Sequence, residues 1–157
     1  MSRRKPKGRL PDKSFYWIPR RVHQSADFRH LSGNAVKLLC ALAYQFTGAN
    51  NGDLTAAWSV MHQQHGFRSP KTLHNVRDEL LAANLLYVTR QGGRGQCSLY
   101  ALTWMPIDDC HGKLDCKPTT LPIRKEWNHD QITAPKTKRM KQSTVIEFAE
   151  RKKQMPQ

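Results

Sequence analysis

Residues 69–104 read SPKTLHNVRDELLAANLLYVTRQGGRGQCSLYALTW, and this stretch decides the fold that we predict. Ser69 and Pro70 mark a helix start, because serine caps free backbone amides and proline suits the first helical position. Branched and aromatic residues over 85–90 and 97–104 predict two strands. Three glycines between these strands predict a tight hairpin turn. The expected order is therefore helix, strand, turn and strand.

Two further helices are expected before this stretch. Ser32 caps the first, which we expect to be the central buried helix. Its apolar side comprises Ala35, Leu38, Leu39, Leu42, Ala43 and Phe46. Thr55 is predicted to cap the second helix, residues 56–65, which Gly66 ends. The helix that begins at Ser69 then follows and ends near Asn84, a plausible left-handed residue.

A cluster of aromatic residues lies near the N-terminus, at residues 15–18. We expect it to cover part of the core, because three aromatics and an isoleucine in a row point to more than one side. The alternative interpretation is a platform on which nucleic-acid bases stack. A single helical turn is predicted shortly after it, at residues 27–30.

The chain of 157 residues suits one domain with tails, and its net charge is +14 from 26 Lys and Arg against 12 Asp and Glu. The excess is concentrated in the flanks: residues 1–30 carry +7, residues 31–90 carry +2 and residues 91–157 carry +5. Such a charge suggests a polyanionic partner, since neutralised phosphates release counterions. A basic protein without such a partner and an RNA-binding protein are the alternatives.

The same composition divides the chain into four parts. We predict a basic flexible arm at 1–13, a folded domain at 14–106, an irregular proline-rich segment at 107–135 and a basic tail at 136–157. Trp127 is expected to anchor the irregular segment to the domain. The tail contains a candidate short helix at 143–153.

No apolar run approaches the ~20 residues that a membrane-spanning helix needs, and no secretion signal is recognisable. We therefore expect a cytoplasmic protein with reduced cysteines and no membrane partner. Cys110, His111, Cys116 and His129 are zinc-ligand types, but they lack the paired spacing of zinc sites. We accordingly expect no metal and no cofactor.

Catalysis has little support in the sequence. There is no glycine-rich phosphate loop followed by Lys-Ser or Lys-Thr, and no nucleophile elbow. Asp108, Asp109 and Asp115 could hold Mg²⁺ in a nuclease, but clustered acids in a loop are more often solvated. We predict a non-enzymatic protein.

The helix after Ser69 carries the candidate DNA-reading side chains. A helix ~10–12 Å across fits the ~12 Å major groove. Lys71 and Asn75 lie opposite its apolar stripe and are expected to contact base edges or phosphates. We expect the other contacts of this helix from Ser69, Thr72 and His74. Arg77 falls near the apolar stripe, so its stem is expected to pack on the helix capped by Ser32.

The glycine-rich turn and the two flanks supply further candidates. Arginine at a glycine-rich tip suits a narrow minor groove or a phosphate. In the turn we predict contacts from Arg90, Arg94 and Gln96. In the flanks we predict phosphate contacts from Arg3, Arg4, Lys5, Lys7, Arg9, Lys136, Lys138, Arg139 and Lys141. We expect the flanks to supply most of the attraction.

From Ser32 to Trp104 the chain resembles winged helix-turn-helix proteins, especially those of phages, plasmids and integrated mobile elements. The resemblance is carried by the LSGNAVKLL helix, the NNGDLT turn, the Ser69-Pro70 helix start and the GGRG turn. It implies an α+β fold of three helices plus a C-terminal β-hairpin wing, with basic and partly disordered tails. It also implies binding to double-stranded DNA, with the third helix in the major groove and the wing on the minor groove or phosphates.

The resulting hypothesis is a non-enzymatic double-stranded DNA-binding protein. We predict a transcriptional regulator, or a replication or maintenance factor, of a mobile genetic element. A homodimer is compatible with this prediction, because such proteins often bind as dimers. The alternative is a winged-helix protein-interaction module, such as a phage-encoded inhibitor or adaptor, with a protein partner.

Overall fold

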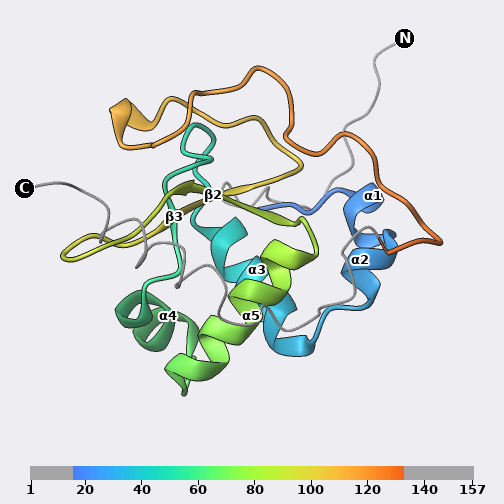
Figure 1. Ribbon diagram of the computed structural model, residues 1–157. Coiled ribbons are helices and arrows are strands. Elements are labelled where there is room, and N and C mark those ends of the chain that lie inside the picture. The colour runs from blue at the N-terminus through green and yellow to red at the C-terminus, as the bar shows by residue number, and fades with distance from the viewer. Residues whose placement is uncertain (1–15, 133–157) are drawn as a thin grey trace, which may run out of the picture.

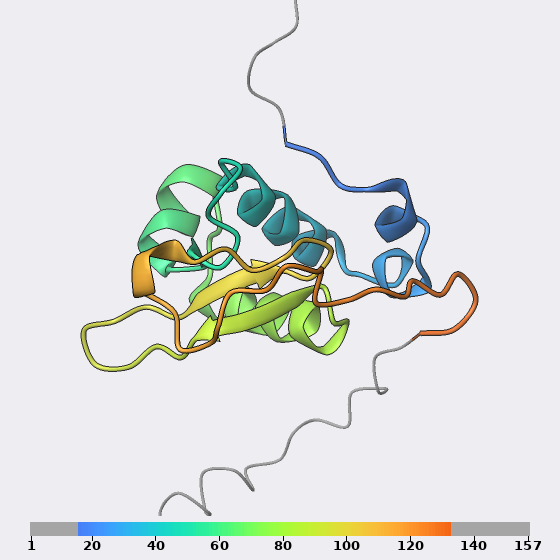
Figure 2. The same cartoon turned by 90° about the horizontal axis from the view of Figure 1, so that it is seen from above.

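The computed structural model describes residues 16–132, which form an α+β unit. In this part of the chain, five α-helices accompany a three-stranded antiparallel sheet (Figures 1 and 2). The predicted arms, Phe15 and the candidate helix at 143–153 lie outside the described residues. The elements are α1 (Arg20–His23), α2 (Ala26–Arg29), α3 (Gly33–Tyr44), β1 (Leu54–Thr55), α4 (Trp58–His65), α5 (Pro70–Ala82), β2 (Leu86–Arg90), β3 (Leu99–Leu102) and the 3₁₀ turn η1 (Cys110–Gly112).

The sheet has the order β1-β3-β2, so β3 is its central strand. Leu54 pairs with Tyr100 on one side of β3, and Leu86 pairs with Leu102 on the other. The prediction of a strand over 97–104 was too long at both ends. Before β3 the register shifts at the hairpin, and after β3 the chain turns, with the Met105 amide bonded to the Leu102 carbonyl at 3.3 Å.

Local capping signals place two of the three long helices where we predicted them. The Ser32 hydroxyl accepts the Ala35 amide at 3.2 Å, and the Ser69 hydroxyl accepts the Thr72 amide at 3.4 Å. Gly66 ends α4 in the left-handed conformation, with φ of 64°.

The predicted start of α4 was wrong, because Thr55 lies in β1 and does not cap the helix. Helix α4 begins at Trp58, two residues later than predicted, with Ala57 at its N-cap position. Pairing of Thr55 with Leu99 in the sheet keeps the backbone extended there. The Thr55 hydroxyl instead accepts the Ala57 amide at 3.2 Å.

The core lies between α3, α5 and the sheet. Leu38, Leu39 and Leu42 of α3 are fully buried, as expected for the central helix. The Glu79 carboxylate joins α5 to α3, because it accepts the Ser32 amide at 2.6 Å and the Ser32 hydroxyl at 2.8 Å. This link satisfies free groups at the N-terminus of α3 and sets how α5 lies against it.

Segment 107–132 contains η1 but no other helix or strand, and it packs on the folded unit. Ile107 is buried, and Trp127 packs against the core as we expected. Asn51 joins this segment to the sheet: its amide donates to the carbonyls of Leu102 at 3.1 Å and Pro106 at 2.7 Å. In Figure 1 the segment runs along the top of the molecule, from the β-hairpin at the left to α1 and α2 at the right.

The expectation that the N-terminal aromatic cluster is buried was wrong for two of its residues. Ile18 packs against the core, whereas Trp17 is 52% exposed and Tyr16 is also exposed. Tyr16 packs edge-on against Tyr44, with ring centroids 6.5 Å apart, and Tyr44 is itself 67% exposed.

Gly92 at the base of the hairpin leaves no room for a side chain. A Cβ atom added there would lie 2.6 Å from the Ser98 nitrogen. We expect Gly92→Ala to lower the free energy of unfolding by about 1–3 kcal/mol through overpacking. The matched control is Gly93→Ala, because a Cβ at Gly93 meets nothing within 4 Å. Urea denaturation of both variants measures the difference; equal stability would contradict the predicted clash.

Candidate nucleic-acid interface

Helix α5 exposes its predicted contact side chains near its N-terminus. Lys71, His74 and Asn75 are exposed, and Lys71 and Asn75 lie four residues apart on the same side of the helix. Thr72 is half-buried. Ser69 is also half-buried, and its hydroxyl is engaged as the helix cap, so it is less available to a ligand than we expected.

The hairpin ends in a two-residue turn at Arg94 and Gly95. Gly93 and Gln96 exchange backbone hydrogen bonds of 3.0 and 3.2 Å, and Gly95 has φ of 79°. Arg94 and Gln96 are both exposed at this tip. Figure 2 shows that the hairpin extends well beyond the body of the molecule. The turn therefore presents one arginine at the end of a projecting arm.

Arg90 has a different environment from the one we predicted. It is half-buried, and its guanidinium donates to the carbonyl oxygens of Cys97 at 3.2 Å and Lys113 at 3.4 Å. Beside it, the Asp115 carboxylate accepts the Gln91 amide at 2.9 Å. These contacts tie the base of the hairpin to segment 107–132. Arg90 thus supports the hairpin, and Arg94 carries its accessible charge.

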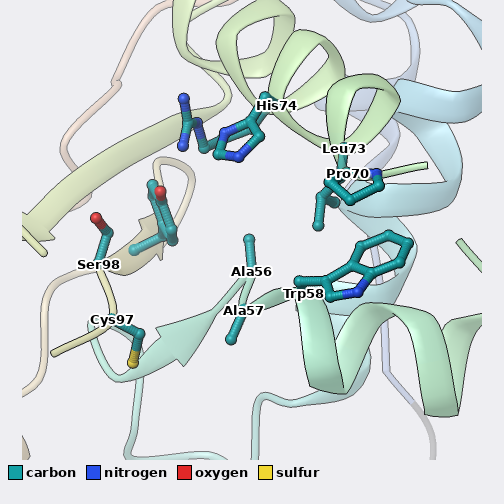
Figure 3. A pocket seen from close by; sticks show the side chains of 10 residues that line it. Ala56, Ala57, Trp58, Pro70, Leu73, His74, Cys97 and Ser98 are labelled. Carbon is teal, nitrogen blue, oxygen red and sulfur yellow. The ribbon is translucent and has the colours of Figure 1, made fainter. Parts of the chain in front are cut away.

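A cleft joins α5 to the base of the hairpin, and we call it the α5–hairpin cleft. Its volume is about 200 Å³. Figure 3 shows His74 on one wall, Ser98 and Cys97 on the opposite side, and Trp58 near Ala56 and Ala57. The complete lining is Ala56, Ala57, Trp58, Pro70, Leu73, His74, Arg77, Cys97, Ser98 and Tyr100.

Arg77 lines this cleft, a position that we did not predict for it. Its guanidinium bonds to the neighbouring Asp78 carboxylate at 2.8 and 3.0 Å. Burial acts to lower the pKa of Arg77, but the bond to Asp78 and the proximity of Tyr100 raise it overall. Arg77 therefore stays positively charged inside the cleft.

Sequence reasoning missed the cleft because its residues come from three separate segments, 56–58, 70–77 and 97–100. Trp58 starts α4, Arg77 lies in the middle of α5, and Tyr100 belongs to β3. No spacing rule connects these positions. Arg68 was not among the predicted contacts, although it is exposed between α4 and α5 and lies three residues before Lys71.

Most of the net charge of the chain falls outside the described residues. Residues 16–132 carry 13 Lys and Arg against 9 Asp and Glu. Residues 1–15 and 133–157, which include all the predicted arm contacts, carry +5 each. Of the residues predicted to contact DNA, the structure therefore describes only those of α5 and the hairpin.

The cysteines and histidines considered for zinc do not gather at one site in residues 16–132. Cys110 is buried against Gly52, whereas the backbone carbonyl of His129 accepts a hydrogen bond from Arg29, the last residue of α2. Burial raises the pKa of the Cys110 and Cys116 thiols, which keeps them protonated. Across residues 16–132 no group of three or more His, Cys, Asp or Glu is placed to hold a metal ion. In the same residues no helix has both the length and the apolar character to cross a membrane.

Comparisons with protein-family models, curated protein sequences and solved structures gave no match. Inference of function therefore rests on the residues of this chain and their geometry. Three features carry most weight: the exposed side of α5, the projecting hairpin and the cleft between them.

Proposed function

We propose that this chain is a non-enzymatic winged helix-turn-helix protein that binds double-stranded DNA. The observation that carries the proposal is that α5 and the base of the hairpin line one cleft, with Lys71 and Arg94 exposed beyond it. The order of elements supports the fold: a capped helix, a short strand, two helices and two strands, with β3 central in the sheet.

The dimensions of α5 suit the DNA major groove. Its 13 residues span about 20 Å at 1.5 Å per residue. In the groove, Lys71 meets a guanine edge or a phosphate, and Asn75 pairs with the N6 and N7 groups of an adenine. Arg94, at the end of the hairpin, reaches the adjacent minor groove or its phosphates.

The basic flanks and the resemblance to proteins of mobile elements support a proposed biological role. We propose a cytoplasmic transcriptional regulator, or a replication or maintenance factor, of a mobile element. Such a protein needs a module that selects a DNA site and basic flanks that bind the phosphate backbone. Here α5 and the hairpin supply selectivity, and the flanks supply most of the attraction. A regulator that acts as a homodimer would bind a palindromic site.

Two substitutions test the contact surface. Lys71→Ala and Arg94→Ala should each weaken duplex binding by roughly tenfold, equivalent to the ~1.4 kcal/mol expected from losing one charged contact. The matched control is Lys125→Ala, because Lys125 is exposed next to Arg124, which pairs with α2 at the other end of the molecule (Figure 1). Fluorescence anisotropy with a labelled duplex, measured over a range of salt concentrations, gives the affinities.

Three results would count against this surface. Unchanged affinity in both variants would remove the α5 and hairpin contacts, and an equal loss in the Lys125 control would indicate a bulk charge effect. Affinity that does not fall with salt would exclude a phosphate-dominated complex. Selection of bound duplexes from a random pool, followed by footprinting, then identifies the target.

A second candidate function has one observation in its favour. Tyr16 packs against Tyr44, and these two residues and the next residue in the chain, Trp17, are all exposed; we call them the aromatic patch. Aromatic residues are enriched at protein interfaces. This patch suits a protein-interaction module of the inhibitor or adaptor type. Weak, sequence-indifferent DNA binding, together with capture of a protein that Trp17→Ala abolishes, would favour this candidate over the first.

A further inference from the structure

Arg77 is a cation that lines the α5–hairpin cleft and that has no role in the DNA contacts proposed for Lys71, Asn75 and Arg94. Its side chain is 27% exposed, and its Nε and Nη2 atoms both bond to the same oxygen of Asp78, at 3.0 and 2.8 Å. Asp78 is 63% exposed. The guanidinium therefore lies at the cleft, while its carboxylate partner lies toward solvent.

The cleft combines polar groups with an apolar wall. Besides Arg77, its polar side chains are those of His74, Ser98 and Tyr100, and each of these can donate a hydrogen bond. The remaining lining is largely apolar, including Trp58, whose ring stacks on His62 at 4.8 Å. Donors and one fixed positive charge in a partly desolvated cleft suit a single anion better than a neutral ligand.

The proposed function determines which anion reaches this place. If α5 enters the major groove and the hairpin reaches the neighbouring groove, the DNA backbone between the two grooves passes over the cleft. The two non-bridging oxygens of a phosphodiester can accept two parallel N–H bonds from a planar guanidinium. We propose that the α5–hairpin cleft binds one phosphodiester of duplex DNA through Arg77, and that Asp78 competes with that phosphate for the guanidinium.

The geometry of the Arg77–Asp78 pair means that a phosphate can replace Asp78 on the guanidinium at a small cost in free energy. Adjacent residues on a helix do not face each other, so the pair forms only when the arginine folds back along the helix. An exposed ion pair contributes little stability, because it gains little Coulomb energy and restrains two side chains. Asp78 is exposed enough to rotate into solvent, whereas Arg77 is held along the cleft beside Tyr100.

A double-mutant cycle on the full chain tests this proposal, which rests on the proposed function. The four proteins are wild type, Arg77→Met, Asp78→Asn and the double variant; methionine keeps an apolar stem in the cleft without the charge. The probe is a fluorescein-labelled duplex two helical turns long. Asp130→Asn is the charge-matched control, because Asp130 lies near His23 and Arg29 at the opposite end.

We expect Arg77→Met to weaken binding by about tenfold and to reduce the slope of log affinity against log salt by about 0.9, the value for one phosphate contact. Asp78→Asn should strengthen binding several-fold in the wild-type background and much less in the Arg77→Met background. Circular dichroism confirms that each variant is folded, and Asp78→Asn tests the competition even if Arg77→Met unfolds.

The possible failures are distinguishable. If wild type does not bind the duplex, the proposed function fails and this inference fails with it. If wild type binds and Arg77→Met binds equally well, only the phosphate site is overturned. If Asp78→Asn strengthens binding equally in both backgrounds, or no more than Asp130→Asn does, Asp78 acts through bulk charge and the competition is overturned.

Discussion

Arg124→Ala should lower the free energy of unfolding by about 3–5 kcal/mol, because it leaves a buried carboxylate without its ion-pair partner. The Arg124 side chain is 4% exposed and pairs with Asp27, which is fully buried, at 2.5 Å. Arg124 also donates to the Ala83 carbonyl at 3.0 Å, at the end of α5. Its guanidinium stacks on Trp127, 4.1 Å from the ring centroid.

These contacts make Arg124 the link among three parts of the fold. Segment 107–132, α2 and the end of α5 meet at its guanidinium, so its loss frees the segment and exposes the end of the core. Removing the charges of both Arg124 and Asp27 should lower the free energy of unfolding less than removing that of Arg124 alone, because no unpaired charge then stays buried. The double variant Arg124→Leu with Asp27→Leu is therefore expected to be more stable than Arg124→Ala.

Urea denaturation, followed by circular dichroism, measures these stabilities. Lys125→Ala serves as the control, because this neighbour is exposed and its loss should change stability by less than ~0.5 kcal/mol. If Arg124→Ala costs no more than the control, segment 107–132 is not held by this ion pair. A double variant that is less stable than the single one would contradict the desolvation argument.

Neutralising the N-terminal arm should cause the largest loss of DNA affinity. The variant replaces Arg3, Arg4, Lys5, Lys7 and Arg9 with glutamine. Each arm residue that neutralises a phosphate contributes about 0.9 to the slope of log affinity against log salt. We expect the slope to fall by several such steps and the affinity at moderate salt to fall by about 100-fold or more.

The reason is the distribution of charge. Residues 16–132 carry 13 basic against 9 acidic side chains, a net charge of +4, whereas residues 1–15 and 133–157 together carry +10. The same duplex used for the α5 variants gives the affinities. The corresponding control replaces Lys136, Lys138, Arg139 and Lys141, which separates the two flanks. If the slope of log affinity against log salt is unchanged in both flank variants, the folded unit supplies the electrostatic attraction to DNA. That result would contradict the proposal that the flanks supply most of it.

Local signals predicted those parts of the fold that depend on a few neighbouring residues. Ser32 and Ser69-Pro70 were recognisable as helix starts, since a cap bonds to an amide three residues later. Asn84 was recognised as a left-handed stop, and its φ is 52°. The hairpin turn was likewise predicted from its glycines. The short helices and exact strand ends were less predictable, because pairing across the sheet decides them.

Side-chain direction over long distances could not be predicted in the same way. Arg90 and Arg94 belong to the same basic hairpin in sequence, yet Arg90 bonds to Lys113, 23 residues away, and Arg94 is exposed. Arg77 was placed toward α3 by helical periodicity, but the structure directs it to the cleft beside Tyr100. Arg124 carried no sequence signal at all, because its partner Asp27 is 97 residues away.

The sequence alone thus determined the order of the main elements, the helix caps, the hairpin and the concentration of positive charge in the flanks. These features depend on interactions between residues close in sequence, or on composition, and so do not require knowledge of which distant segments pack together. Only the tertiary structure decided which basic residues are exposed, which support the hairpin and which line the cleft. Those roles depend on which distant segment packs against each side chain, and burial and hydrogen bonding to that segment set them.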